Sequence, residues 1–390
     1  MGDATLGHKV RGSVLRQARP VSVAVMTVWA SGFLTSCAAP VAQLPDMAKD
    51  VVAAEQRAQQ IAQLRRYYSE RHRMDAVAFR IRTANVAACK DRIAAQIGLT
   101  AATPRSLPRR YQSYASEALS IGWSRPTAIS VVEGSPAAQA GLVAGDELTA
   151  LNGDLIPLWG TANWMWRKIA ENGTDPVRLD VRRDGVDRTV TVTPVMGCSI
   201  PVEYHIDETV NASASDLKIL ITSGILALTQ SDAELALVIG HELAHSTLGH
   251  LDKQRWNTIV GAAAGAAIDV GILAGGVSTG GAFRKQFGGL GAMAYSVGFE
   301  READYVGAYY AARAGYDTKG TEEIWRRMAF VQPQSILSGR THPIMAVRFV
   351  QIQKTTAEIE DKKRRGRPLE PELKSADADP APAVEAAARH

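Results

Sequence analysis

The sequence predicts an α+β protein in which an N-terminal helical region (37–117) precedes a β-rich domain (118–197) and a mainly helical domain (198–355). The β-rich middle is indicated by short alternating strands between turns that contain glycine and proline. The helical domain is indicated by long apolar stretches after residue 230. A chain of 390 residues is long enough for two or three domains with separate cores.

The first 36 residues have the form of an export signal. A basic stretch precedes an uncharged run (21–36) that is shorter than the roughly 20 residues a membrane-spanning helix needs. The run ends in L-T-S-C, which resembles the bacterial lipobox and implies acylation of Cys37 and a lipid anchor in the membrane. By resemblance to enterobacterial sorting, Ala38 favours the outer membrane. An ordinary signal peptide with an incidental cysteine is the alternative.

The charge balance gives no reason to expect nucleic acid as a partner. The chain has a net charge of +4, and residues 1–36 hold four basic residues against one acidic residue, or +3. The remaining chain is therefore close to neutral, at 4 − 3 = +1, whereas nucleic-acid-binding domains concentrate positive charge on one face.

Two cysteines, Cys89 and Cys198, remain besides Cys37. In an exported protein, two such cysteines pair more often than they stay free, so we predict a disulfide between them. It would join the region before the β-rich domain to the segment just after it. Two buried thiols are the alternative.

The β-rich domain carries a distinctive pattern at 134–153. It reads G-S-P-A-A-x-A-G-L-x-x-G-D-x-L and then N-G, in which Ser135 is expected to cap a short helix and the final N-G to close a tight turn. This pattern resembles the core of bacterial PDZ domains, which bind extended peptides beside a groove. The resemblance implies a peptide partner, with 121–123 (I-G-W) as the candidate carboxylate-binding loop. A structural spacer is the alternative.

A predicted helix after Ser231 carries the motif H-E-L-A-H. The residues from Ser231 onward have the form of a capping box, followed by an apolar run. His241 and His245 lie one turn apart on one helix face, so both imidazoles can reach one tetrahedral zinc ion. Glu242 can take a proton from water at the metal. A helix with two solvated histidines is the alternative.

Two histidines leave zinc short of a protein ligand, and residues 299–307 (F-E-R-E-A-D-Y-V-G) offer one. Glu300 and Asp304 are one helical turn apart, a spacing that resembles the gluzincin ligand and its supporting carboxylate. Glu300 would complete the ligand set, and Asp304 would accept the N–H of a ligand histidine. Glu302 is the competing ligand, and His250 is interpreted as structural. A solvated charged helix face is the alternative.

A third motif, T-H-P-x-x-x-x-R at 341–348, follows. The three motifs together, over roughly 201–352, resemble the zinc endopeptidase family of the CAAX prenyl protease, HtpX and BepA. The resemblance implies a gluzincin-type fold that binds one zinc ion per chain. It also implies that His342 stabilises the oxyanion or blocks the open coordination position as a switch. Arg348 would brace the fold around Asp304.

Two further segments lack a catalytic motif. Residues 259–282 are rich in alanine, glycine and branched apolar residues with one charge, Asp269. Relatives have membrane spans here, but the charge and the glycines favour an apolar helical hairpin or lid in this chain. Residues 356–390 are predicted to be a disordered tail.

The favoured hypothesis is a lipid-anchored periplasmic zinc metalloendopeptidase that acts on envelope proteins, including misfolded ones, with its PDZ domain engaging peptide ends. The alternative is a catalytically silent or latent envelope chaperone or scaffold that uses the PDZ groove. Glu242 favours the enzyme, because an inactive descendant can bind metal without this residue and would usually have lost it first.

Overall fold

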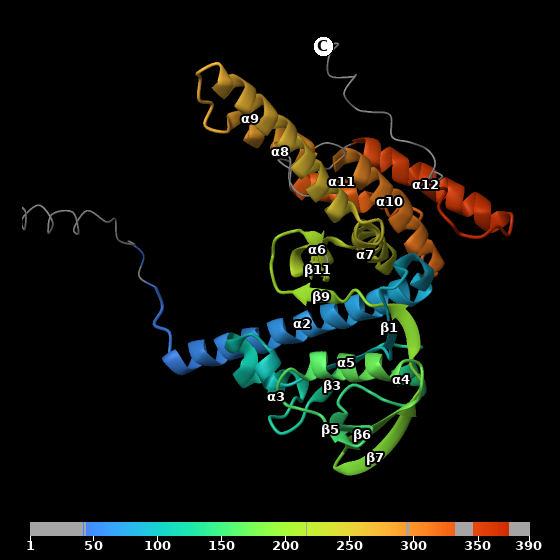
Figure 1. The fold of residues 1–390 in the computed structure, drawn as a ribbon. Coiled ribbons are helices and arrows are strands. Elements are labelled where there is room, and N and C mark those ends of the chain that lie inside the picture. The colour runs from blue at the N-terminus through green and yellow to red at the C-terminus, as the bar shows by residue number, and fades with distance from the viewer. Residues whose placement is uncertain (1–41, 43, 216, 294–295, 332–345, 374–390) are drawn as a thin grey trace, which may run out of the picture. The chain divides into compact units, whose positions relative to one another are not determined.

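The computed structural model describes residues 42, 44–215, 217–293, 296–331 and 346–373. The chain divides into two units, residues 1–55 and 56–390. Helix α2 (Lys49–Ala84) begins in the first unit and continues into the second. The second unit contains every other element of Figure 1 and has the predicted α+β fold.

The β-rich domain is built on one antiparallel sheet with the strand order β2-β3-β4-β6-β7, and β5 pairs with β4. The sheet begins at Leu99, earlier than the expected boundary at residue 118. Helices α4 and α5 belong to the same domain (Figure 1). The bounds are β2 Leu99–Ala102, β3 Thr127–Val131, α4 Pro136–Gln139, β4 Glu147–Leu151, β5 Asp154–Leu155, α5 Thr161–Asn172, β6 Val177–Arg183 and β7 Val186–Val192.

Local sequence explains the start of helix α4 and the turn between strands β4 and β5. The Ser135 hydroxyl accepts a hydrogen bond from the Ala138 N–H at 3.3 Å and so caps α4, as expected for serine before proline. Asn152 and Gly153 have φ values of +51° and +87°, which the tight turn between β4 and β5 requires. The core beneath the sheet includes Leu148, Leu179 and other buried aliphatic side chains.

A second, two-stranded sheet and a disulfide join the start and the end of the β-rich region. Strands β1 (Ile93–Gln96) and β8 (Val195–Cys198) pair antiparallel. The predicted disulfide between Cys89 and Cys198 is present, with the two Cα atoms 5.6 Å apart. It ties the segment after α2 to the end of β8.

The helical domain packs helices against a three-stranded sheet of order β10-β11-β9, in which β11 runs parallel to β9. Its core is continuous with the C-terminal half of α2 through Met74, Val77 and Ile81. The bounds are β9 Val202–His205, β10 Ala212–Ala214, β11 Ile219–Thr222, α6 Ser223–Leu228, α7 Asp232–Thr247, α10 Ser296–Arg313, α11 Glu323–Val331 and α12 Ala346–Arg364. A short helix, α3 (Ala115–Leu119), lies between β2 and β3 in the sequence.

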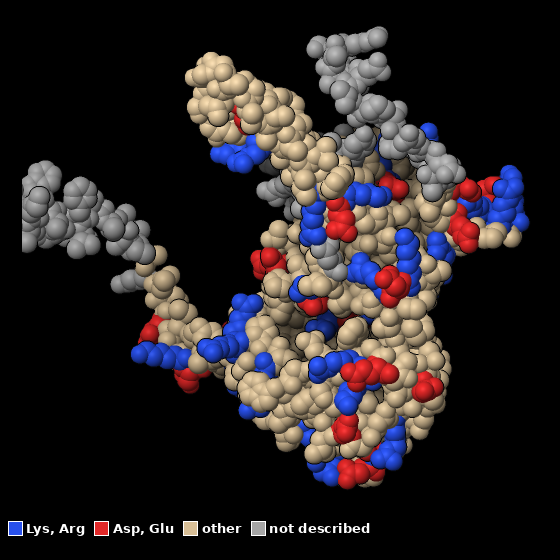
Figure 2. Space-filling view, viewed as in Figure 1, with Lys and Arg blue, Asp and Glu red and all other residues tan. Residues whose placement is uncertain are grey.

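Helices α8 (His250–Ala274) and α9 (Ala282–Met293) form a hairpin, as expected for this apolar segment. Glycines permit the close packing, since a Cβ on Gly261 would lie 2.2 Å from the Phe287 carbonyl oxygen. The Asp269 carboxylate accepts hydrogen bonds from the Phe283 and Arg284 N–H groups and so caps α9. The hairpin surface in Figure 2 carries few charges, and α8 is long and apolar enough to cross a membrane by length and composition.

The predicted disordered tail begins too early. Helix α12 continues to Arg364, and the residues after it return along α10. Lys362 donates a hydrogen bond to Glu372 at 2.8 Å, and Arg313 donates one to the Leu369 carbonyl at 2.8 Å. Charged side chains with buried stems hold this segment, so it lacks the apolar period that a sequence search looks for.

Candidate metal centre

Helix α7 starts where its capping residues predict. The Ser231 hydroxyl accepts a hydrogen bond from the Glu234 N–H at 3.2 Å. The Glu234 carboxylate accepts from the Gln230 N–H at 2.7 Å, one residue before the position expected for a capping box. These contacts fix the first turn, and every residue from Glu234 to His245 is buried.

Three side chains from α7 and α10 converge in the interior. The Nε2 atoms of His241 and His245 are 3.0 Å apart. The two carboxylate oxygens of Glu300 lie 3.4 Å from His241 Nε2 and 3.3 Å from His245 Nε2. All three residues are buried, and their possible ligand atoms lie within 4.8 Å of one another.

Two glycines allow α7 and α10 to approach closely enough for this geometry. A Cβ on Gly307 would lie 2.6 Å from the His241 backbone nitrogen, and one on Gly240 would lie 2.5 Å from the Gly307 carbonyl oxygen. Both distances are shorter than van der Waals contact allows. The glycine at the end of the F-E-R-E-A-D-Y-V-G stretch therefore brings Glu300 within reach of the histidines.

Asp304 contacts the ring nitrogen of His241 that faces away from the cluster. Its Oδ1 atom lies 2.9 Å from His241 Nδ1, so the ring presents Nε2 to the cluster. Arg348, on α12, contacts the same carboxylate with Nε at 2.6 Å and Nη2 at 2.8 Å. Its Nη1 lies 3.0 Å from Glu300. One buried guanidinium therefore holds the carboxylates of both Glu300 and Asp304.

The pKa values of the two histidines are shifted in opposite directions. Burial lowers the pKa of His241, but the hydrogen bonds and charges of Asp304 and Glu300 outweigh burial and raise this pKa to about 9. For His245, burial outweighs Glu300 and lowers the pKa to about 4.

His250 has a contact that the sequence did not predict. Its Nδ1 lies 3.0 Å from His245 Nδ1, and its Nε2 lies 3.0 Å from Glu302. Glu302 thus supports a histidine instead of competing as a ligand. The available signal in the sequence was the glycine before His250. Gly249 adopts φ +66° after the end of α7, and this turn directs His250 back toward His245.

The donor set fits a zinc ion. Two imidazole nitrogens and one carboxylate are the protein ligands of one class of catalytic zinc site. Nitrogens about 2.0–2.1 Å from a tetrahedral ion lie about 3.3 Å apart, close to the observed separation of the two Nε2 atoms. Glu242, 2% exposed, lies on the same helix between the two histidines. Such a site is typical of zinc metallopeptidases.

Other predicted residues lie elsewhere. Cys37 and His342 are outside the described residues. The expected carboxylate-binding loop at 121–123 is wrong, because Ile121 is buried in a separate apolar cluster with Tyr111. The residues that precede strand β2, Ile97 and Gly98, line the groove beside α5 instead. The signal was Q-I-G-L at 96–99, a glycine directly before a short strand.

Comparisons with known proteins agree with this class. Residues 201–356 match Peptidase family M48, a family of zinc metallopeptidases, and residues 128–183 match the PDZ domain. The chain thus carries a metallopeptidase domain of Peptidase family M48 preceded by a PDZ domain.

The similar proteins cover only parts of the chain. It is 31% identical over 123 residues to the putative beta-barrel assembly-enhancing protease of Vibrio cholerae serotype O1, a match that spans 28% of this chain and 24% of that protein. Two solved structures each cover 27% of this chain with a TM-score of 0.21. They are the HtrA3 PDZ domain bound to a phage-derived ligand, at 20% identity over 88% of its length, and the HtrA-type protease AlgW with a decapeptide, at 19% identity over 30%.

Proposed function

We propose that the protein is a zinc-dependent endopeptidase that hydrolyses peptide bonds of envelope proteins in the bacterial periplasm. The observation that carries the proposal is the buried convergence of His241, His245 and Glu300, beside the Glu242 that hydrolysis would need. The match to Peptidase family M48 supports the same reaction class.

Each residue has a proposed role in the reaction. Bound zinc would act as a Lewis acid on the scissile carbonyl and lower the pKa of water at the site. Glu242 would take the proton from the attacking water and return it to the leaving amine. Asp304 would hold His241 in the tautomer that presents Nε2. His342 would stabilise the oxyanion or act as a switch, and Arg348 would hold the carboxylates in place.

The PDZ domain is proposed to engage peptide, either from a substrate or from a partner protein. Strand β2 is at the end of its sheet, so its second edge can accept an extended chain, as in strand addition. The envelope location is proposed from the lipobox-like sequence at Cys37 and from the similarity to the beta-barrel assembly-enhancing protease of Vibrio cholerae. The apolar α8–α9 hairpin would then rest against lipid or apolar substrate.

The test is cleavage of β-casein, an unfolded substrate, by the zinc-loaded chain without its leader. We expect cleavage by the wild type and a loss of roughly 100-fold or more in Glu242→Gln with zinc retained. Cleavage only in His342→Ala would indicate a histidine-gated enzyme. Zinc binding without cleavage in any variant would contradict the proposal and favour the scaffold.

A further inference from the structure

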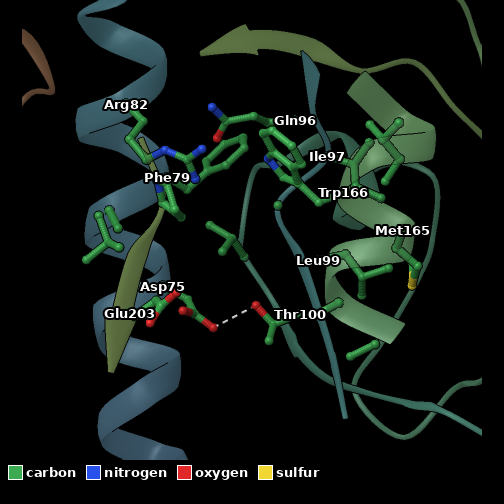
Figure 3. Close-up of a pocket in the computed structure, with 18 of the residues that line it drawn as sticks. Asp75, Phe79, Arg82, Gln96, Ile97, Leu99, Thr100, Met165, Trp166 and Glu203 are labelled. Atoms are coloured by element: carbon green, nitrogen blue, oxygen red, sulfur yellow. Dashed lines mark hydrogen bonds between the residues drawn. The ribbon is translucent and has the colours of Figure 1, made fainter. Parts of the chain in front are cut away.

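A cavity of about 610 Å³ lies between α2, β2 and α5, with β9 contributing part of its wall. Figure 3 shows α2 on one side and α5 on the other, with β2 between them. None of the proposed zinc ligands lines the cavity, so it is separate from the metal centre.

The strand and helix sides of the cavity suit an extended chain that ends in an apolar residue. Strand β2 pairs with β3 along one edge and has no ladder partner on the other in the described part of the chain. Ile97, Leu99, Met165 and Trp166 provide apolar lining. Such a surface can take main-chain hydrogen bonds and one apolar side chain.

The head of the cavity contains a partly buried cation, Arg82. Arg82, on α2, donates from Nε to the Cys198 carbonyl at 2.9 Å. Its Nη2 atom is buried and has no hydrogen-bond partner among the described residues. Burial lowers the pKa of Arg82 to about 10, so the guanidinium remains charged at neutral pH. A buried charged donor without an acceptor is costly unless a ligand supplies one.

The other charges that line the cavity are neutralised locally. Asp75 accepts a hydrogen bond from Thr100 at 2.8 Å and lies 3.7 Å from Arg71. Glu203 pairs with Lys218 at 2.6 Å. No carboxylate of the described residues lies within ion-pair distance of Arg82. The charge without an ion-pair partner at contact distance is thus one positive charge, which matches a carboxylate better than a doubly charged phosphate.

For a polypeptide C-terminus held in this cavity, we propose that Arg82 is the cation that receives the terminal carboxylate. This rests on the proposed peptide binding by the PDZ domain and goes further. Arg82 lies on α2, outside the region 128–183 that matches PDZ domains, so the helix before the domain completes its ligand site.

The disulfide sets the position of this cation. The Cys198 carbonyl accepts hydrogen bonds from Arg82 Nε and from Gln96 Nε2, the latter at 2.8 Å. Cys198 is bonded to Cys89, which follows the end of α2. The bond therefore holds both side chains at the head of the cavity (Figure 3).

The test uses fluorescein-labelled decapeptides that end in valine, leucine, lysine or aspartate, each as the free acid and as the C-terminal amide. Binding is measured by anisotropy to the zinc-loaded chain in a Glu242→Gln background, so that the probes are not cleaved. With Arg82 present, we expect acids that end in valine or leucine to bind at least tenfold more tightly than their amides. In Arg82→Gln, this ratio should fall below twofold, and Arg82→Lys should keep part of it.

Two variants separate the possible failures. Arg80→Gln removes the same charge from the exposed face of α2, outside the cavity, and should keep the tenfold ratio. Trp166→Ala should weaken acid and amide alike. An acid preference that survives Arg82→Gln, or equal binding of acid and amide with Arg82 present, would overturn the proposal and leave peptide binding intact. No binding of any peptide would refute the peptide-binding role of the PDZ domain as well.

Discussion

His250 Nδ1 lies 3.0 Å from His245 Nδ1, and Glu302 lies 3.0 Å from the other nitrogen of the same ring. The two proposed zinc-binding histidines are therefore supported differently. His241 is supported by a carboxylate that an arginine holds, whereas His245 is supported by a second histidine. Partners of this kind fix the orientation of a metal-binding ring and its basicity.

His250→Ala should weaken zinc binding by roughly 10- to 100-fold, because His245 would lose the partner that orients its ring. The affinity is measured by competition with a chromophoric zinc chelator. His205→Ala, which removes an exposed histidine on β9, is the control and should leave the affinity unchanged. An unchanged affinity in His250→Ala would show that the contact does not support the site.

Gly307→Ala should separate α10 from α7, since the added methyl group would lie 2.6 Å from the His241 backbone nitrogen. We expect at least a tenfold loss of zinc affinity, because Glu300 moves with α10. Gly298→Ala on the same helix meets nothing within 4 Å and should be neutral or stabilising by up to about 1 kcal/mol. Equal effects of the two substitutions would mean that the close approach is unimportant.

Arg348→Met should destabilise the fold by roughly 3–5 kcal/mol, because Asp304 and Glu300 would keep buried charges without their partner. Arg348→Lys keeps the charge but loses the two-point contact with Asp304, so an intermediate loss is expected. Urea unfolding of the three proteins measures the difference. A methionine variant as stable as the wild type would contradict the proposed bracing role.

The pH dependence of stability should change in Asp146→Asn. Burial raises the pKa of Asp146, but the hydrogen bonds from Arg183 and the Val143 N–H, together with the Arg183 charge, outweigh burial and lower it. A lowered folded-state pKa stabilises the fold above the unfolded value of about 4, and this contribution is lost as the pH falls through the folded value.

Asp146→Asn should therefore cost about 2 kcal/mol at pH 7, the range of hydrogen bonds to charged groups, with a smaller cost below about pH 4. Urea unfolding of both proteins at pH 7 and at pH 3 measures this. A cost that is the same at both values would show that the carboxylate charge does not stabilise the domain.

The sequence predicted best what depends on spacing within one element. One helical turn separates His241 from His245 and Glu300 from Asp304, so local periodicity indicated both halves of the cluster. The disulfide was also predicted, because Cys89 and Cys198 are the two cysteines of the sequence besides the expected lipidation site, Cys37.

Contacts between distant elements were harder to predict. Strand β2 has only four residues and pairs with β3 across a gap of 24 residues, from Ala102 to Thr127, so the glycine directly before it was a weak local signal for the groove strand. Arg82 reaches the cavity from a helix that the sequence placed outside the domain. The contact of His250 with His245 depends on the positive φ of Gly249; the sequence offers the glycine but not its conformation.

The most direct test of the central claim is the position of zinc itself. A crystal of the zinc-loaded chain, measured on both sides of the zinc absorption edge, gives an anomalous difference map that locates the ion. We predict one peak per chain, bounded by Nε2 of His241, Nε2 of His245 and the carboxylate of Glu300. That peak should persist in Glu242→Gln. The absence of a peak between these three side chains, or a peak bounded by other residues, would contradict the proposed site.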